Sequence, residues 1–333
     1  MNILVIRFSS LGDVILTTPV FSYLKRRFPD STITFLTDKN YVDLFSDDPR
    51  LKSVLGFHKS DNVDKLSIIN EVWDFVVDLQ NSPRSQLIFK SIKKKKSTGV
   101  FAKFHIKRLL LILTKINFYP AQSNVITRYL RAAGMVESTI NIEKSPNLFF
   151  KPPSSSQYDR LIQSDTIIRP TIALFPFSAW KNKEWPVKYF MMVGKFFISK
   201  GWNVIIMGSR SEKENADQLR LLIGSRAISL AGQLSLYECG CVLSRCTVAL
   251  GNDSGLSHLA RACGVKTGII YGPTTYHFGF YPSGNPPFKV FETPMHCRPC
   301  HPHGGNVCWR FNHDCMKNIN PEIVIKGLIN MLE

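Results

Sequence analysis

The sequence predicts an α/β protein made of two doubly wound domains, and three observations lead to that prediction. Short apolar runs alternate with amphipathic stretches over the first 150 residues. The same alternation begins again after about residue 170. Between them lies FFKPPSSSQYD at 149–159, whose prolines and serines are typical of a linker. Strands that alternate with helices form parallel sheets covered by helices. We therefore expect domains at 1–150 and 151–320, followed by a terminal helix at 321–333.

The strands of each half are predicted from short apolar runs bounded by turn residues. In the first half, the run at 2–8 leads through a polar turn into a stretch of helical periodicity at 13–27, which Pro29 ends. Further strands are expected at 32–37, 53–57, 75–79, 171–175, 203–207, 247–250 and 267–271. Sheets of this kind bind ligands beyond the carboxyl ends of their strands, so the chemistry is expected there, in a cleft between the domains.

The charge of the chain indicates anionic partners. The 333 residues include 42 Lys and Arg against 25 Asp and Glu, a formal net charge of +17. Nucleic acid, an anionic membrane surface or a phosphorylated substrate would each suit this excess, and a generally basic proteome would also explain it. No apolar run approaches the roughly 20 residues that span a bilayer, and no signal peptide is recognisable. We expect a cytoplasmic protein, peripheral to the inner membrane.

A turn with the sequence RFSSLGD follows the first predicted strand, at residues 7–13. Gly12 permits a tight turn, and Asp13 would stand at the start of the next helix. Asp13 can serve as a helix cap, because acidic side chains are favoured there. It can also serve as a general base that takes a proton from an attacking hydroxyl. The turn alone leaves both interpretations open.

Two further segments follow strands of the second half. FPFSAWKNKEWP at 175–186 offers lysines that would neutralise a diphosphate, although an exposed loop would also contain them. GNDSGLSHLA at 251–260 opens a helix whose backbone N–H groups could bind a phosphate, with Asp253 available to sugar hydroxyls and His258 one turn on. An ordinary helix cap beside a buried histidine is the alternative interpretation.

These segments together resemble glycosyltransferase family 9, the ADP-heptose:lipopolysaccharide heptosyltransferases. The likeness runs nearly end to end, through ILVIRFSSLGDVILTTPVFSYLKRRFP, KEWP, GSRSE, LAGQLSLYE, VALGNDSGLSHLARACGV and YGPTTYHFGFYP. It implies a GT-B fold of two Rossmann-like domains facing a central cleft. It also implies an inverting transfer from a nucleotide sugar, with ADP-heptose as the donor, to a phosphorylated glycolipid of the lipopolysaccharide core. No cofactor is implied for catalysis.

The resemblance also implies roles for single residues. Asp13 matches the family's base, and Lys183 matches the lysine that binds the donor phosphate. The residues implied in donor binding are Lys183, Ser178, Met207, Gly208, Gly232, Asp253, Ser254, Gly255 and His258. The family usually has a Pro-Gly-Ala-Ser-like turn where this chain has Pro-Phe-Ser-Ala at 176–179. Phe177 thus replaces a glycine, which leaves a different nucleotide-sugar donor open.

A basic segment lies in the first half. Between residues 84 and 131 there are no Asp or Glu and twelve Lys or Arg, at 84, 90, 93–96, 103, 107, 108, 115, 128 and 131. An apolar patch at 109–113 adjoins them. The mixture favours an element that contacts anionic lipid and the acceptor, and a solvated loop is the alternative. The candidates for this contact are Lys93, Lys94, Lys95, Lys96, Lys107 and Arg108.

Four cysteines gather near the end of the chain, at Cys297, Cys300, Cys308 and Cys315. A CxxC pair with two further cysteines suits a structural zinc ion, although the spacing is not that of a standard zinc finger. Free thiols and disulfides remain alternatives.

Two other functions are weighed against the transferase. A zinc-stabilised nucleic-acid-binding protein would explain the charge, but no recognised module is present and no nucleic acid is expected. A nicotinamide oxidoreductase would need G-x-G-x-x-G after the first strand, where this chain has SSLGDV.

Overall fold

The computed structural model describes residues 1–58, 60–63, 66–97, 99–120, 124–135, 144–151 and 169–333. Positions 152–159 of the predicted linker lie outside the described residues. The chain divides into two compact units, Met1–His105 with Tyr119–Phe149, and Ile106–Phe118 with Phe150–Glu333. The segment Ile106–Phe118 therefore packs with the second unit, although its neighbours in sequence on both sides belong to the first.

The first unit is built on a parallel five-stranded sheet in the order β3-β2-β1-β4-β5. The interior of β1 is fully buried, as the apolar run of the sequence predicts. The strands are β1 (Asn2–Ile6), β2 (Thr32–Asp38), β3 (Ser53–Phe57), β4 (Val72–Asp78) and β5 (Lys93–Ser97). The four strands predicted for this half are confirmed as β1 to β4, and β5 is an addition.

The predicted helix at 13–27 is divided into two. Helix α1 ends at Ile15, and helix α2 begins at Thr18 with Pro19 in its first turn. Proline has no N–H to continue the ladder, so the carbonyl of Ile15 accepts from the hydroxyl of Thr18 instead, at 2.9 Å. The helices of this part of the chain are α1 (Leu11–Ile15), α2 (Thr18–Arg27), α3 (Pro83–Ser91), α4 (His105–Thr114) and α5 (Val125–Ala132), with short 3-10 helices η1 (Lys39–Tyr41), η2 (Asp43–Phe45) and η4 (Ser67–Ile69).

The run of four lysines forms strand β5 at the edge of this sheet. Lys95 pairs with Asp74 at 3.0 Å, and Lys94 donates to the carbonyl of Phe89 at 2.5 Å. Lysines on an edge strand disfavour pairing with another chain, which gives the run a structural role that the sequence analysis did not foresee.

The second unit contains a parallel six-stranded sheet in the order β11-β10-β9-β6-β7-β8. Its strands are β6 (Thr171–Phe175), β7 (Asn203–Ile206), β8 (Ala227–Ser229), β9 (Val248–Asn252), β10 (Lys266–Tyr271) and β11 (Phe288–Glu292). The four predicted strands are confirmed as β6, β7, β9 and β10. The pattern missed β8, which has three residues, and β11, whose residues are mostly half-exposed.

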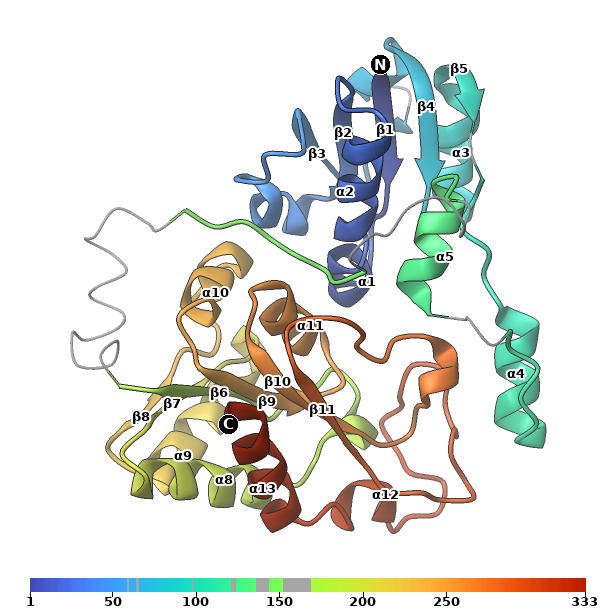
Figure 1. Ribbon diagram of the computed structural model, residues 1–333. Helices are drawn as coiled ribbons and strands as arrows, with labels where there is room; N and C mark the ends of the chain where they lie inside the picture. Colours follow the sequence, from blue (N-terminus) through green and yellow to red (C-terminus); the bar gives the residue numbers. More distant parts are fainter. Residues whose placement is uncertain (59, 64–65, 98, 121–123, 136–143, 152–168) are drawn as a thin grey trace. The chain divides into compact units, whose positions relative to one another are not determined.

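Helices cover both faces of this second sheet (Figure 1), with α8, α9 and α13 on one side and α10 and α11 on the other. The predicted terminal helix is confirmed as α13. The helices are α8 (Val187–Ser199), α9 (Lys213–Ile223), α10 (Leu236–Leu243), α11 (Gly255–Ala262), α12 (Asp314–Lys317) and α13 (Pro321–Leu332), with 3-10 helices η5 (Lys181–Lys183), η6 (Arg210–Glu212) and η7 (Tyr276–Phe278). Within the residues described, none of the helices has the length and apolar character needed to cross a membrane.

Trp185 is a large side chain that follows the loop carrying Lys181 and Lys183. Its packing predicts an effect on the stability of the protein. Its side chain is fully buried against Tyr189 and Phe190, and its Nε1 donates to the carbonyl of Ile319 at 3.0 Å. Trp185→Ala should lower the free energy of unfolding by about 3–5 kcal/mol in urea denaturation, because it leaves a cavity. Trp180→Ala, at a residue 40% exposed, should change it by less than about 1 kcal/mol. Equal effects at both positions would contradict this packing.

Candidate active site

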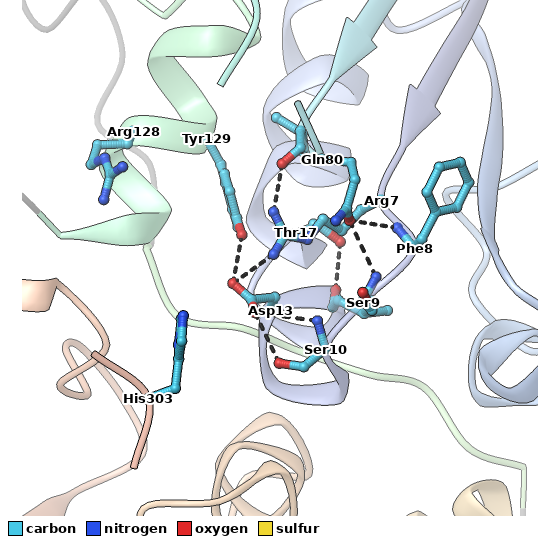
Figure 2. Close-up of polar contacts among 12 residues, drawn as sticks. Arg7, Phe8, Ser9, Ser10, Asp13, Thr17, Gln80, Arg128, Tyr129 and His303 are labelled. Atoms are coloured by element: carbon cyan, nitrogen blue, oxygen red, sulfur yellow. Dashed lines mark hydrogen bonds and ion pairs between the residues drawn. The ribbon is translucent and has the colours of Figure 1, made fainter. Parts of the chain in front are cut away.

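The Asp13 carboxylate lies in the first unit, one short turn beyond β1. Arg7, only 5% exposed, contacts its Oδ1 at 2.8 Å and donates through the other terminal nitrogen to the carbonyl of Leu79 at 2.6 Å. The hydroxyl of Tyr129, on α5, donates to the same Oδ1 at 3.0 Å. Figure 2 shows these side chains converging on Asp13. The ends of β1 and β4 and one helix thus position one carboxylate.

The second carboxylate oxygen of Asp13 turns back to the start of its own helix. Its Oδ2 accepts from the backbone N–H of Ser10 at 3.3 Å and from the hydroxyl of Ser10 at 2.9 Å. The capping interaction weighed in the sequence is therefore present, and it occupies only one of the two oxygens. A cap and a reactive carboxylate are compatible in this geometry.

Asp13 is held in its ionised form. Burial alone would raise its pKa, but the Arg7 charge and the hydrogen bonds from Ser10 and Tyr129 outweigh it, so the pKa is lowered from its ordinary value. Burial, together with the neighbouring carboxylate, raises the pKa of Tyr129 well above the ordinary value, so Tyr129 stays a donor. At neutral pH the site holds a carboxylate able to accept a proton.

The turn that carries Asp13 is fixed by residues far away in sequence. The side-chain oxygen of Gln80 accepts from the N–H groups of Phe8 and Ser9, at 3.0 and 3.2 Å. The Arg7 guanidinium also lies 5.4 Å from the centre of the Tyr129 ring. The sequence analysis missed Arg7, Gln80 and Tyr129. A cation directly after a buried strand was the one local signal for Arg7.

The second unit pairs Lys183 with Asp253. The Lys183 ammonium lies 2.5 Å from Asp253 Oδ2 and 3.3 Å from the Asp253 carbonyl, and the hydroxyl of Thr274 donates to the same Oδ2 at 3.2 Å. Burial would raise the pKa of Asp253, but Lys183, His258 and Thr274 outweigh it and lower the pKa. A cation and an anion from two loops therefore meet beyond the carboxyl ends of β6 and β9.

Asn252, the last residue of β9, ties these two loops together. Its side-chain oxygen accepts from the N–H of Trp185 at 2.9 Å, and its amide donates to the carbonyl of Pro176 at 2.9 Å. Gly251 before it has no room for a side chain, because a Cβ would lie 2.6 Å from the ring of Phe175. Since the partners are separated by about seventy residues, the sequence did not reveal this role of Asn252.

The remaining donor-site residues fall into two groups. Ser254 precedes α11, Gly255 begins it, and His258 is buried on it, so these three adjoin Asp253. Met207 and Gly208 follow β7, and the Gly208 carbonyl accepts from the N–H of Gly232 at 3.0 Å. A Cβ on Gly232 would meet the Arg210 backbone at 2.5 Å. The structure thus brings the three residues implied around the nucleotide base next to one another.

The turn at 176–179 does not direct the side chain of Phe177, the residue that departs from the family's pattern, toward the lysine loop. Phe177 is 7% exposed and packs in the hydrophobic core of the unit. The N–H of Ser178 donates to the Glu184 carboxylate at 3.1 Å, and Lys181 pairs with the same carboxylate. The bulk of Phe177 is therefore directed into the core, and Glu184 holds the Ser178 backbone.

The predicted zinc site finds no support in the described residues. Cys297, Cys300, Cys308 and Cys315 are free thiols, and the described residues contain no group of three or more His, Cys, Asp or Glu placed to hold a metal ion. Burial, followed by the neighbouring thiols, raises the pKa of Cys315 to about 12.

Hydrogen bonds hold the cysteine-containing segment instead. Asn182 exchanges two backbone and side-chain hydrogen bonds with Gly305, at 2.9 and 2.6 Å. His313 Nε2 lies 2.7 Å from the Asn182 carbonyl. The segment is therefore attached directly beside Lys183.

The candidate lipid-contacting cations do not share one element. Lys93, Lys94, Lys95 and Lys96 belong to β5 of the first unit, whereas Lys107 and Arg108 lie on α4, which packs with the second unit. The basic segment of the sequence is thus divided between the two units, and its contact with lipid stays a prediction.

Two parallel α/β units of this kind, each with charged side chains beyond its strand ends, are the architecture of GT-B glycosyltransferases. The model of glycosyltransferase family 9 (heptosyltransferase) matches residues 65–301, and the chain belongs to this family. Lipooligosaccharide heptosyltransferase 2 of Haemophilus ducreyi is 25% identical over 87% of this chain and 86% of its own length.

Solved structures share the fold. A glycosyltransferase family 9 protein from Veillonella parvula has a TM-score of 0.78 and 20% identity, covering 99% of this chain and 97% of its own. The E. coli ADP-heptose lps heptosyltransferase II has a TM-score of 0.76 and 20% identity, covering 100% and 98%. The alternatives of an oxidoreductase and a nucleic-acid-binding protein are not favoured.

The ion pair of Asp13 predicts a pH-dependent stability. Its folded pKa is depressed, so its contribution to the free energy of unfolding is complete above about pH 4, the unfolded pKa, and is lost as pH falls through the lower folded pKa. Asp13→Asn leaves Arg7 buried without its counter-ion and should lose on the order of 3 kcal/mol at pH 7.

This loss should shrink toward zero as the pH is lowered, measured by urea denaturation from pH 7 to pH 2.5. Asp61→Asn, at an exposed ion pair with Lys39, is the control and should have little effect at any pH. A loss in Asp13→Asn that stays constant over the whole range would contradict the ion-pair account.

Proposed function

We propose that this glycosyltransferase moves a heptose from ADP-heptose to the core of a lipopolysaccharide-type glycolipid, with inversion at the anomeric carbon. The observation that carries the proposal is the buried Lys183–Asp253 pair at the strand ends of the second unit. The names of the relatives support the sugar and the acceptor class. No cofactor is required for the displacement proposed below.

Lys183 and the start of α11 would bind the diphosphate of the donor. The ammonium is held by Asp253 and can exchange this carboxylate for a phosphate oxygen, while Asp253 turns to the hydroxyls of the sugar. Backbone N–H groups of Ser254 and Gly255, at the helix start, would donate to the same diphosphate. His258, one turn on, lies beside Asp253 and contributes to its ionisation.

The adenine would lie at the paired loops after β7 and β8. Met207, Gly208 and Gly232 leave backbone and a small apolar surface there, and Gly232 has no room for a side chain. The Phe177 departure does not block the diphosphate, since its ring is in the core. That burial removes the steric reason for doubting an ADP-linked donor, and the Ser178 hydroxyl accepts from the N–H of Trp180 at 3.3 Å, near the lysine loop.

Asp13 would act as the general base. The oxygen of an acceptor hydroxyl attacks the anomeric carbon, its proton passes to Asp13, and the bond to the diphosphate breaks with its electron pair leaving on ADP. Arg7, Tyr129 and Ser10 keep the carboxylate ionised and aimed before the reaction. Lys183 neutralises the charge that develops on the leaving group.

The acceptor is borne by a lipid, so we place the enzyme at the cytoplasmic face of the inner membrane as a peripheral protein. The excess of Lys and Arg between 84 and 131 supports contact with anionic lipid and with the phosphates of the acceptor. The candidates for the electrostatic part of this contact are Lys93, Lys94, Lys95, Lys96, Lys107 and Arg108, of which Lys94, Lys95 and Arg108 also contact groups of the protein itself.

Calorimetric titration tests the donor assignment. ADP and ADP-heptose should bind the purified protein, whereas UDP-glucose and NAD should not. Lys183→Ala should weaken ADP binding about 10- to 100-fold, because a charged hydrogen bond is lost and Asp253 is left unpaired near the phosphate.

Lys181→Ala is the matched control, since this lysine belongs to the same loop but its side chain is 66% exposed. It should bind ADP within about twofold of the unmodified protein, as expected for a surface ion pair. Absence of adenine-nucleotide binding would overturn the donor, and an equal loss in both variants would overturn the site.

A further inference from the structure

Two cations of the α4 segment, Arg108 on the helix and Lys115 just after it, contact the second unit. Arg108 lies 3.3 Å from His303 Nε2, with its guanidinium 5.3 Å from the centre of the Phe278 ring. Lys115, just after the helix, donates to the carbonyls of Cys297 and Pro299 at 3.1 and 2.7 Å. Polar contacts of this kind usually lie on the outer face of a surface helix.

The apolar side chains of α4 are exposed instead. Ile106, Leu109, Leu110 and Leu113 are 76%, 57%, 37% and 69% exposed. Their spacing is i, i+3, i+4 and i+7, so they form one stripe along the helix, here called the outer stripe. Leu111, at 2% exposed, is the apolar residue that packs inward. A contiguous apolar stripe of this kind marks a contact surface.

Exposed aromatic and aliphatic residues occur in the segments that α4 contacts. Asn117 lies 3.1 Å from His277, the neighbour of Tyr276, which is 57% exposed. The segment bound by Lys115 and Arg108 continues into Val307, Trp309 and Phe311, which are 71%, 62% and 86% exposed. Aromatic side chains among cations are the composition that proteins present to the interface of a bilayer.

The charge around the stripe decides between lipid and a second copy of the chain. From residue 106 to residue 118, the part of the basic segment that packs with the second unit, there are three Lys or Arg and no Asp or Glu, within a chain of net charge +17. Two copies meeting through this stripe would bring these cations together without counter-charge. Anionic headgroups would supply that counter-charge around a buried apolar stripe.

We propose that α4 docks the second unit on an anionic bilayer by burying the outer stripe at the boundary between headgroups and acyl chains. The inference rests on the proposed function in that the acceptor is borne by a lipid. It assigns the contact to the leucines of α4, whereas two lysines of the 93–96 run are engaged within their own sheet, Lys94 with Phe89 and Lys95 with Asp74. The docked helix would hold the nucleotide-sugar unit close to its lipid-borne acceptor.

Co-sedimentation with vesicles of phosphatidylglycerol and phosphatidylethanolamine tests the proposal on the full chain. The double variant Leu109→Glu/Leu113→Glu should lower the partition coefficient by about tenfold or more, since the burial of one leucine corresponds to a factor of this size. Leu221→Glu/Leu222→Glu on α9 adds the same charge at leucines that are 68% and 57% exposed, and should stay within about twofold of the unmodified protein.

A milder pair, Leu109→Ser/Leu113→Ser, should also weaken binding and guards against misfolding, which circular dichroism checks for every variant. The proposal is overturned if the α4 variants bind the vesicles like the unmodified protein, or if the α9 pair weakens binding equally. It is also overturned if neutral phosphatidylcholine vesicles bind equally well. Sedimentation velocity provides one more test. If the unmodified protein is a dimer, and the α4 variants are monomers with unchanged vesicle binding, the stripe is a contact between two copies and the proposal is overturned.

Nucleotide binding separates this inference from the function on which it rests. The α4 variants should bind ADP like the unmodified protein, because the stripe is not part of the Lys183 site. If the unmodified protein does not bind ADP, the proposed donor is wrong. The vesicle experiment still tests the docking of α4 in that case. If ADP binds normally and the α4 variants bind vesicles as well as the unmodified protein does, only the docking inference is wrong.

Discussion

The buried ion pair between Arg7 and Asp13 is the interaction on which the first unit's site depends. Arg7 is tied to the end of β4 through the Leu79 carbonyl, so the sheet itself sets where the carboxylate stands. An unpaired charge in this position would be strongly destabilising, and the pair is stable only because every polar atom of the carboxylate has a donor. The second unit contains a similar ion pair between Lys183 and Asp253, and the hydroxyl of Thr274 donates a further hydrogen bond to the Asp253 carboxylate. In each unit a carboxylate is thus held ionised by a neighbouring cation and by hydrogen-bond donors.

The sequence could predict the residues that directly follow buried strands, because the carboxyl end of a parallel strand is where side chains leave the sheet. Asp253 directly follows β9, and Asp13 and Lys183 lie in the turns beyond β1 and β6. The sequence pointed to all three as candidate site residues, and it predicted eight of the eleven strands in the described residues. Their partners could not be found, since they come from distant segments: Leu79 and Gln80 are 72 residues from Arg7 and Phe8, and Tyr129 is 116 residues from Asp13. Such contacts depend on tertiary packing, which no local pattern encodes.

Two expectations depend on contacts that the local sequence does not contain. The four cysteines have a spacing compatible with zinc, but hydrogen bonds from Asn182 and Lys115 place their segment, and the described residues hold no group of three or more ligands arranged for a metal ion. The basic segment was expected to contact anionic lipid, and the structure divides it, because Lys93–Lys96 pair as an edge strand while α4 packs with the other unit. For α4, the sequence shows the leucines and the cations that a membrane-contacting helix needs. Only the contacts of Arg108, Leu111 and Lys115 decide which of them face outward.

The central claim is that Asp13 activates an acceptor hydroxyl for displacement of ADP, and acceptor-dependent release of ADP from ADP-heptose measures this most directly. With a truncated lipopolysaccharide core as the acceptor, the unmodified protein should release ADP and form the glycoside with inverted anomeric configuration. Asp13→Asn should bind ADP normally and lower kcat by about 10²- to 10⁴-fold. Release of ADP at the unmodified rate by Asp13→Asn, or at a rate that ignores the acceptor, would contradict the account.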